Sequence, residues 1–354
     1  MLSAMAFQHP LFKPWQVDLA GYALIDAPGA RGYFERVGLD SQDVITNWRL
    51  AHAYPLNTFQ VSLRRRTRGV GSGAIVAQRI KRVDSIESKL RRYGNLKLST
   101  IQDIGGCRAI VGSVQQVYQL AELYRRKYSK HILDDQDDYI SEPKQDGYRS
   151  YHLIYRYSDP KHPEFENLKI EIQLRSVLQH AWATAVETVD TFLREGLKSH
   201  RGSPEWRRFF ALMGSALALR EGTRRVPRTP SETPELLDEL RQCVEHLNVF
   251  GQLEAFRRAL GAVPVIRRFK WVVLELDPGA GGTGEGTYGL RIYGYRAGQI
   301  EDATQRLETL ERHKAKGVDA VLVSVAGAAS LISAYPNYFL DTQQFLRAVR
   351  QALS

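Results

Sequence analysis

Polar and aromatic side chains crowd a short segment between Ser141 and His152. Pro143 and Gly147 favour a turn there, and the segment then runs into an apolar strand at 152–157. Such a turn offers cations and hydroxyl groups for phosphate and a flat ring for a base. Its polar members are Lys144, Tyr148, Arg149, Ser150 and His152. We interpret the segment as a candidate nucleotide-binding turn; the alternative is an ordinary polar surface loop.

Two carboxylates elsewhere in the chain have the chemistry to bind a hard cation. Asp103 precedes small and branched residues that predict a buried strand at 106–112. Glu171 lies in the segment 168–175, which predicts a second strand. An Asp beside one strand and a Glu on another can converge on Mg²⁺, which binds one or two carboxylates together with substrate phosphates. An ordinary half-exposed antiparallel strand gives the same alternation as 168–175, so that reading stays open.

Apolar and polar residues alternate strictly along 168–175. The apolar ones at every second position are expected to point into the core. The polar residues between them share the opposite face of the strand, and they are Glu171, Gln173 and Arg175. Gln173 and Arg175 are therefore natural supporting groups for Glu171.

Four segments together resemble the synthetase domain of the RelA/SpoT family, the alarmone synthetases. They are Arg79-Ile-Lys81 with Ser85 and Lys89, Asp103-Ile-Gly-Gly-Cys-Arg108, Pro143-Lys-Gln-Asp-Gly-Tyr-Arg-Ser-Tyr-His152, and Glu171-Ile-Gln-Leu-Arg175 followed by Trp182. The resemblance covers about residues 40–225, a little over half of the chain. It implies an α/β (α+β) domain with a nucleotidyltransferase-like fold, a mixed sheet flanked by helices.

The resemblance also implies a chemistry. Family members transfer the β,γ-pyrophosphate of ATP to the 3′-hydroxyl of GDP or GTP and release AMP. Asp103 and Glu171 match the positions that hold Mg²⁺, and a carboxylate such as Glu171 can also accept the hydroxyl proton. The remaining matches on the ATP side fall into two groups. Arg79 and Arg108 match the residues that sandwich the adenine, and the phosphate contacts correspond to Lys81, Ser85 and Lys89.

The acceptor side is implied by the same comparison. Lys144 and His152 match contacts to the acceptor phosphates, and Tyr148 matches the tyrosine that stacks on guanine. Further acceptor-site residues are expected beside them, namely Arg149, Ser150, Gln173 and Arg175.

The residue before Gly147 departs from the family pattern. The family commonly has Asn there, and this chain has Asp146. An amide both donates and accepts hydrogen bonds, whereas an ionised carboxylate only accepts, so the choice of acceptor stays open. Asp146 can equally take the turn-capping role, because Asp and Asn both favour turns.

Three functions therefore remain open. The first is a small alarmone synthetase that makes ppGpp or pppGpp. The second is a toxic relative that uses the same core on adenosine nucleotides or the 3′ end of tRNA, with the C-terminal unit as a restraining or sensing module. The third is a catalytically silent nucleotide-binding regulator, against which the intact Asp103 and Glu171 argue.

Composition agrees with a soluble enzyme that has anionic partners. The 354 residues include 49 Lys and Arg against 39 Asp and Glu, a net charge of +10, which favours nucleotides, tRNA or other RNA as partners. The densest basic run is Arg64-Arg65-Arg66-Thr67-Arg68; it is either a solvated helix face or an ATP- or RNA-attracting loop. Two cysteines without metal-ligand spacing, no evident secretory signal and no membrane span predict a cytoplasmic protein, and a homo-oligomer is compatible with the sequence.

The order of the expected elements predicts four parts. They are an N-terminal extension (1–40), the synthetase domain (41–222), a linker with a connector helix (223–262) and a small α/β C-terminal domain (263–354). Within the synthetase domain, helices are expected at 41–68 with a break or kink at Pro55, and at 83–93, 114–128, 177–195 and 204–221; strands are expected at 106–112, 131–140, 150–157 and 168–175. In the tail, strands are expected at 269–276, 288–295 and 320–325, and helices at 297–316 and from 342.

Overall fold

A computed structural model describes most of the chain. The described residues are 7–126, 130–193, 204–247, 249–250, 253, 269, 271–277, 289–296, 298–299, 301–302, 305–306, 309–310, 319–324 and 343–354. The chain divides into two compact units. The first unit is Met1–Tyr139 with Ser150–Ser176, and the second is Ile140–Arg149 with Val177–Ser354.

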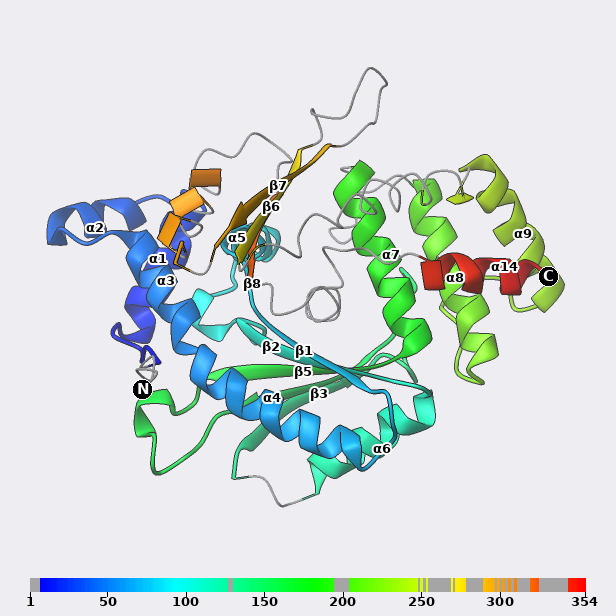
Figure 1. Cartoon of the computed structure of the whole chain (residues 1–354), viewed down its shortest axis with the longest axis horizontal. Helices are drawn as coiled ribbons and strands as arrows, with labels where there is room; N and C mark the ends of the chain where they lie inside the picture. Colours follow the sequence, from blue (N-terminus) through cyan, green and yellow to red (C-terminus); the bar gives the residue numbers. More distant parts are fainter. Residues whose placement is uncertain are drawn as a thin grey trace. The chain divides into compact units, whose positions relative to one another are not determined.

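The first unit is built on a five-stranded mixed sheet (Figure 1). Its strands are β1 (Ile75–Ile80), β2 (Gly105–Val111), β3 (Ile132–Asp138), β4 (Tyr151–Arg156) and β5 (Lys169–Ser176), in the order β1-β2-β5-β4-β3. The pair β2 and β5 is parallel, and the other neighbours are antiparallel. Its helices are α1 (Pro14–Leu24), α2 (Ala30–Val37), α3 (Ser41–Ala51), α4 (Ala53–Arg68), α5 (Val83–Arg92) and α6 (Val114–Arg125). The predicted mixed sheet flanked by helices is confirmed.

Helices α4 and α6 cover one face of this sheet (Figure 1). The apolar residues of β5 face them and are fully buried, as their alternation predicts. Gly105 allows close packing between β2 and the start of α4, because a Cβ atom there would lie 2.7 Å from Ile170 Cδ1 and 3.3 Å from His52 Cβ. The polar residues of the sheet consequently lie on the face away from α4 and α6.

The expected helix 41–68 is two helices, α3 and α4, separated at His52. Pro55 lies in the first turn of α4, where the missing N–H of proline breaks no hydrogen bond, so the predicted break occurs just before it. The basic run at 64–68 forms the C-terminal end of α4. The sequence did not predict helices α1 and α2 or the edge strand β1, since β1 lacks a regular alternation of apolar and polar residues.

Within its described residues, the second unit combines four helices with a small sheet. The helices are α7 (Val177–Leu193), α8 (Pro204–Arg220), α9 (Thr233–His246) and α14 (Gln343–Leu353). The antiparallel sheet has the order β7-β6-β8, with β6 (Trp271–Asp277), β7 (Gly289–Tyr295) and β8 (Asp319–Ser324). Most of the predicted helix 297–316 and of the connection between β6 and β7 lies outside the described residues.

The last helix, α14, shares a core with α7, α8 and α9. Phe345 is fully buried, and its ring centroid lies 6.1 Å from that of Phe209 and 5.9 Å from that of Phe210. The end of the chain is thereby tied to the helices that follow β5, although the sequence alone places it in the small C-terminal domain. Among the described residues, no helix combines the length and apolar character needed to cross a membrane.

Candidate active site

Strand register brings the polar residues of four strands to one face of the five-stranded sheet. Arg79 on β1 pairs with Gly106 on β2, and Gly106 pairs with Glu171 on β5. In the next row Gln173 lies between Arg108 and His152. Paired positions on neighbouring strands point to the same face, so these side chains share the surface opposite α4 and α6.

Asp103 lies just before β2 between two lysines. Its Oδ2 accepts a hydrogen bond from Lys81 Nζ at 2.5 Å, and its Oδ1 accepts one from Lys89 Nζ at 2.9 Å. Lys81 is anchored by its own backbone, whose N–H donates to the carbonyl of Ile104 at 2.8 Å. Burial opposes ionisation of Asp103, but the two ammonium groups outweigh it and hold the pKa of the carboxyl well below its usual range. Asp103 is therefore an anion at neutral pH.

Glu171 lies nearby on β5 with both carboxylate oxygens engaged. His152 Nδ1 donates to Oε1 at 3.1 Å, and Gln173 Nε2 donates to Oε2 at 2.8 Å. Burial and the charge of Asp103 both raise the pKa of Glu171, but His152 and Arg79 outweigh them and the pKa is lowered overall. The influence of Asp103 on Glu171 means that the two carboxylates lie within electrostatic range. The sequence indicates His152 and Glu171 separately and does not foretell their contact.

The other predicted ATP-side residues surround this pair of carboxylates. Ser85 and Lys89 are four residues apart on α5, which places them on one face of that helix. Arg79 is exposed, whereas Arg108 is buried in β2. Burial lowers the pKa of Lys81, and the positive charge of Arg79 lowers it further. The cations of this site are therefore close enough to repel one another.

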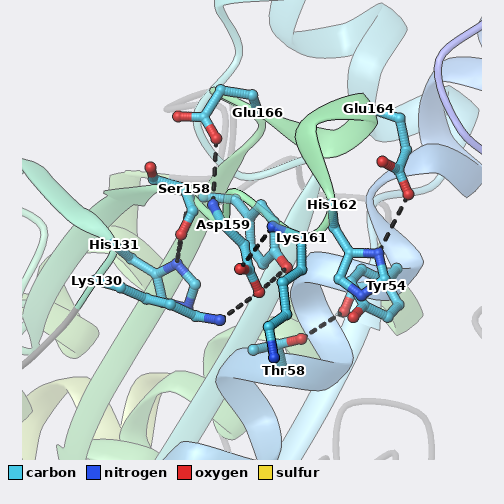
Figure 2. A network of polar contacts seen from close by, with 11 residues as sticks. Tyr54, Thr58, Lys130, His131, Ser158, Asp159, Lys161, His162, Glu164 and Glu166 are labelled. Carbon is cyan, nitrogen blue, oxygen red and sulfur yellow. Dashed lines mark hydrogen bonds and ion pairs between the residues drawn. The ribbon is translucent and has the colours of Figure 1, made fainter.

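The loop between β4 and β5 is fixed by its own polar network, which Figure 2 shows. Asp159 accepts hydrogen bonds from the backbone N–H of Lys161 at 3.2 Å and from the Tyr157 hydroxyl at 3.3 Å, and it also pairs with Lys130. The backbone N–H of Asp159 donates to Glu166 Oε2 at 3.2 Å. This network holds the connection between the two strands that carry His152 and Glu171.

The predicted nucleotide-binding turn belongs to the second unit. Gly147 has φ +98°, and a Cβ atom there would lie 2.6 Å from the carbonyl oxygen of Phe210 on α8, so only glycine fits. The backbone N–H of Gly147 donates to the Lys144 carbonyl at 2.9 Å. Asp146 Oδ1 accepts from the backbone N–H of Tyr148 at 2.9 Å. Asp146 therefore takes the turn-capping role that the sequence left open for it.

Two of the predicted acceptor contacts meet in this turn. Lys144 Nζ lies 5.4 Å from the centroid of the Tyr148 ring, a cation–π arrangement. Tyr148 also contacts an apolar neighbour. Its ring packs edge-on against that of Trp182, with 6.3 Å between the two ring centroids. Tyr148 is half-buried.

Arg149 is buried rather than presented to solvent. Its Nη1 donates to Glu221 Oε2 at 2.7 Å and to Thr223 Oγ1 at 3.1 Å. Burial lowers the pKa of Arg149, and the opposite charge of Glu221 counters that effect. Glu221 and Thr223 were missed by sequence reasoning, because nothing in their local pattern marks a partner so distant along the chain.

The donor chemistry of this site fits a hard divalent cation. Asp103 and Glu171 are ionised carboxylates within electrostatic range, the ligand type that Mg²⁺ prefers. Within the described ranges there is no group of three or more His, Cys, Asp or Glu side chains arranged to hold a metal. The remaining ligands would therefore come from substrate phosphate and water, which is how Mg²⁺ is commonly bound in nucleotide enzymes.

Most residues of this polar sheet face lie in a segment that matches a known family of proteins. Residues 78–190 match the sequence model described as the region found in RelA / SpoT proteins. The resemblance drawn from the four motifs is confirmed for this segment.

Individual relatives and solved structures are also similar to this chain. Over 112 residues the chain is 38% identical to the GTP pyrophosphokinase YjbM of Bacillus subtilis and 33% identical to the GTP pyrophosphokinase YwaC of the same organism. These alignments span 31% and 30% of this chain, and the chain spans about half (52%) of each relative. A solved GTP pyrophosphokinase family protein from Streptococcus pneumoniae is 22% identical, with a TM-score of 0.40, over 48% of this chain and 84% of that one.

Proposed function

We propose that this chain is an ATP-dependent pyrophosphotransferase that makes ppGpp or pppGpp from GDP or GTP. The observation that carries the proposal is the arrangement of Asp103, which pairs with Lys81 and Lys89, within electrostatic range of the ionised Glu171. All four residues lie in the segment that matches the RelA / SpoT region. Two curated relatives, 38% and 33% identical over 112 residues, are named GTP pyrophosphokinases. A site that binds polyphosphate needs cations, and a transfer to a hydroxyl group needs a proton acceptor nearby.

The ATP side is assigned to the cations around Asp103. Lys81 and Lys89 neutralise the carboxylate, and both are flexible ammonium groups that can bind phosphate oxygens instead. Ser85 lies on the same helix face as Lys89 and supplies a hydroxyl group. Arg79 and Arg108 carry planar guanidinium groups that can stack on adenine.

The reaction balances as a displacement at the β-phosphorus of ATP. The 3′-hydroxyl oxygen of the acceptor forms a bond to that phosphorus, the bond to the oxygen shared with the α-phosphorus breaks, and AMP leaves with that oxygen. The hydroxyl proton passes to Glu171, which is ionised and so can accept it. On the acceptor side Tyr148 offers a ring for the guanine, and Lys144 and His152 offer donors for its phosphates.

Mg²⁺ is the cofactor that these residues fit. Asp103 and Glu171 would hold it together with phosphate oxygens, and the ion would supply charge neutralisation of the polyphosphate. The chain's own residues then have two tasks: the lysines and arginines bind and orient ATP, and Glu171 accepts the proton.

Asp146 stands where the family commonly has asparagine. Its carboxylate accepts a hydrogen bond from the Tyr148 backbone N–H and caps the turn, so this difference does not argue for another acceptor nucleotide. Acceptor identity is therefore decided by experiment. The purified chain is incubated with Mg²⁺, ATP labelled in the β- and γ-phosphates, and GDP, GTP, ATP or tRNA as acceptor. We expect label to move to GDP and GTP with release of AMP. Transfer only to ATP or to tRNA would show that the toxic-relative hypothesis is right, and no transfer to any of them would refute the proposal.

A further inference from the structure

Glu171 stands at the end of a chain of side-chain hydrogen bonds along its own strand. Gln173 Nε2 donates to Glu171 Oε2 at 2.8 Å. Arg175 Nη2 in turn donates to Gln173 Oε1 at 2.9 Å. The three residues occupy alternate positions of β5, so they share the polar face of the sheet.

The chemistry of these groups fixes the direction of the chain. A guanidinium group can only donate hydrogen bonds, so the atom of Gln173 that faces Arg175 must be its carbonyl oxygen. The NH₂ group of the same amide then necessarily faces Glu171, whose carboxylate can only accept. Arg175 therefore determines the orientation of the Gln173 amide. In the reversed orientation the amide oxygen would face a Glu171 carboxylate oxygen, and neither of them can donate a hydrogen bond.

Arg175 is itself held in place. Its side chain is buried, and its Nε lies 3.4 Å from Ser150 Oγ. The Ser150 hydroxyl donates its proton to the carbonyl of Leu174 at 3.2 Å, which leaves its oxygen free to accept from Arg175. This series of hydrogen bonds thus runs from the Leu174 carbonyl on β5 to the Glu171 carboxylate, and each donor in it has an acceptor.

We propose that Arg175 and Gln173 are positioning residues, which set the orientation of the Glu171 carboxylate rather than contact the acceptor nucleotide. The inference rests on the proposed role of Glu171 as the proton acceptor. Gln173 holds one oxygen and His152 holds the other, so the carboxylate keeps one orientation while the acceptor hydroxyl approaches. A fixed orientation matters because a displacement of about 1 Å in a reacting group can reduce the rate on the order of a hundredfold.

The test compares three variants of the full chain: Gln173→Met, Gln173→Glu and Arg175→Met. We expect kcat to fall about ten- to a hundredfold in each, with the KM for ATP and for the acceptor changed less than about threefold. Gln173→Glu keeps length and polarity but cannot donate, so it should be as impaired as Gln173→Met. The double variant Gln173→Met/Arg175→Met should be no worse than either single variant, because the two residues act in series. A raised acceptor KM with unchanged kcat, or additive losses in the double variant, would overturn the inference.

Lys169→Met is the matched control. Lys169 lies two residues before Glu171 on the same strand face, but its ammonium group pairs with Asp134 at 2.7 Å. The control should keep kcat within about twofold of the unaltered chain. Thermal melting of all variants separates loss of fold from loss of function. Gln173 is less buried than Arg175, so we expect the Gln173 variants to fold even if Arg175→Met does not.

A crystal structure supplies a readout that needs no activity. In Arg175→Met we expect the Gln173 amide and the Glu171 carboxylate to leave their present orientations, whereas in Lys169→Met they should keep them. An unmoved Glu171 in Arg175→Met would refute the positioning role. An unaltered chain that transfers no pyrophosphate would refute the proposed function alone, because the structural comparison still decides the role of Arg175.

Discussion

Arg149 and Glu221 form a buried ion pair across 72 positions of the chain, with Nη1 and Oε2 2.7 Å apart. The side chains are 2% and 7% exposed. Arg149 directly follows the turn that carries Tyr148, and Glu221 follows the last residue of α8. The pair therefore fastens the turn to the end of α8 within the second unit.

Removing one partner of this pair should be costly. Glu221→Leu leaves a buried guanidinium group without its counter-charge, and we expect the free energy of unfolding to fall by about 3–5 kcal/mol. The double variant Arg149→Met/Glu221→Leu should regain most of that loss, because apolar side chains of similar size can replace a buried pair. Denaturant unfolding measures both. Arg241→Met, which breaks an exposed pair with Asp238 on α9, is the control and should cost less than about 1 kcal/mol.

The same double variant tests whether Arg149 contacts the acceptor. Its burial leads us to expect a holding role, so the acceptor KM of the double variant should stay within about threefold of the unaltered chain. A double variant that is stable but has a strongly raised acceptor KM would restore the direct contact that the motif implies.

Asp103→Asn and Glu171→Gln should each reduce pyrophosphate transfer by at least about a hundredfold while the fold is kept. Both changes remove a charge and preserve shape, and a lost general base alone is worth about 10²–10⁴ in rate. Transfer is measured with labelled ATP, and folding is checked by circular dichroism. Turnover near that of the unaltered chain in either variant would disprove the assigned chemistry.

Tyr148→Ala should raise the acceptor KM about ten- to a hundredfold and leave the KM for ATP nearly unchanged. The expected cost corresponds to loss of one base stack, about 1–3 kcal/mol. Tyr148→Phe keeps the ring and serves as the matched control. Equal effects on both substrates would show that Tyr148 serves only to pack against Trp182.

Stability of the first unit should fall as the pH drops below about 6.5. His52 is buried, and burial lowers its pKa from 6.5 to about 4, while a hydrogen bond from its Nδ1 to the Trp48 carbonyl at 2.7 Å opposes that shift. The unfolded chain binds a proton at His52 before the folded one does, so the stability is present above pH 6.5 and lost as the pH falls towards 4. By pH 5 the loss is about 2 kcal/mol.

Urea unfolding at about pH 7.5 and pH 5 measures this effect. His52→Phe removes the titrating group and should shrink the difference in stability between the two pH values. An equal pH dependence in the unaltered chain and in His52→Phe would assign the effect to other groups.

Phe345→Ala should destabilise the second unit by about 3–5 kcal/mol, because the ring is fully buried between α14 and α8. Arg347→Ala on the exposed side of the same helix is the control and should change the stability by less than about 0.5 kcal/mol. Unfolding monitored by denaturant titration gives both values. A small loss in Phe345→Ala would mean that α14 does not contribute to this core in solution.

The sequence by itself determined the features that depend on local periodicity. Alternation over 168–175 placed Glu171, Gln173 and Arg175 on one face, because the side-chain period of a strand is two. Turn residues around Gly147 and the proline in α4 located a turn and a helix break, since both act on their own backbone. The motifs themselves were enough to indicate the family whose model matches residues 78–190.

Only the tertiary structure decided which of these faces and turns meet. The antiparallel pairing of β4 with β5 sets His152 in the row of Gln173 and within reach of Glu171, and strand pairing between segments is not written in either strand's own pattern. The edge strand β1 is held by its pairing with β2 rather than by its own alternation. From the sequence Arg149 is expected in the acceptor site, but the fold buries it against Glu221, because long-range burial decides which charge is paired.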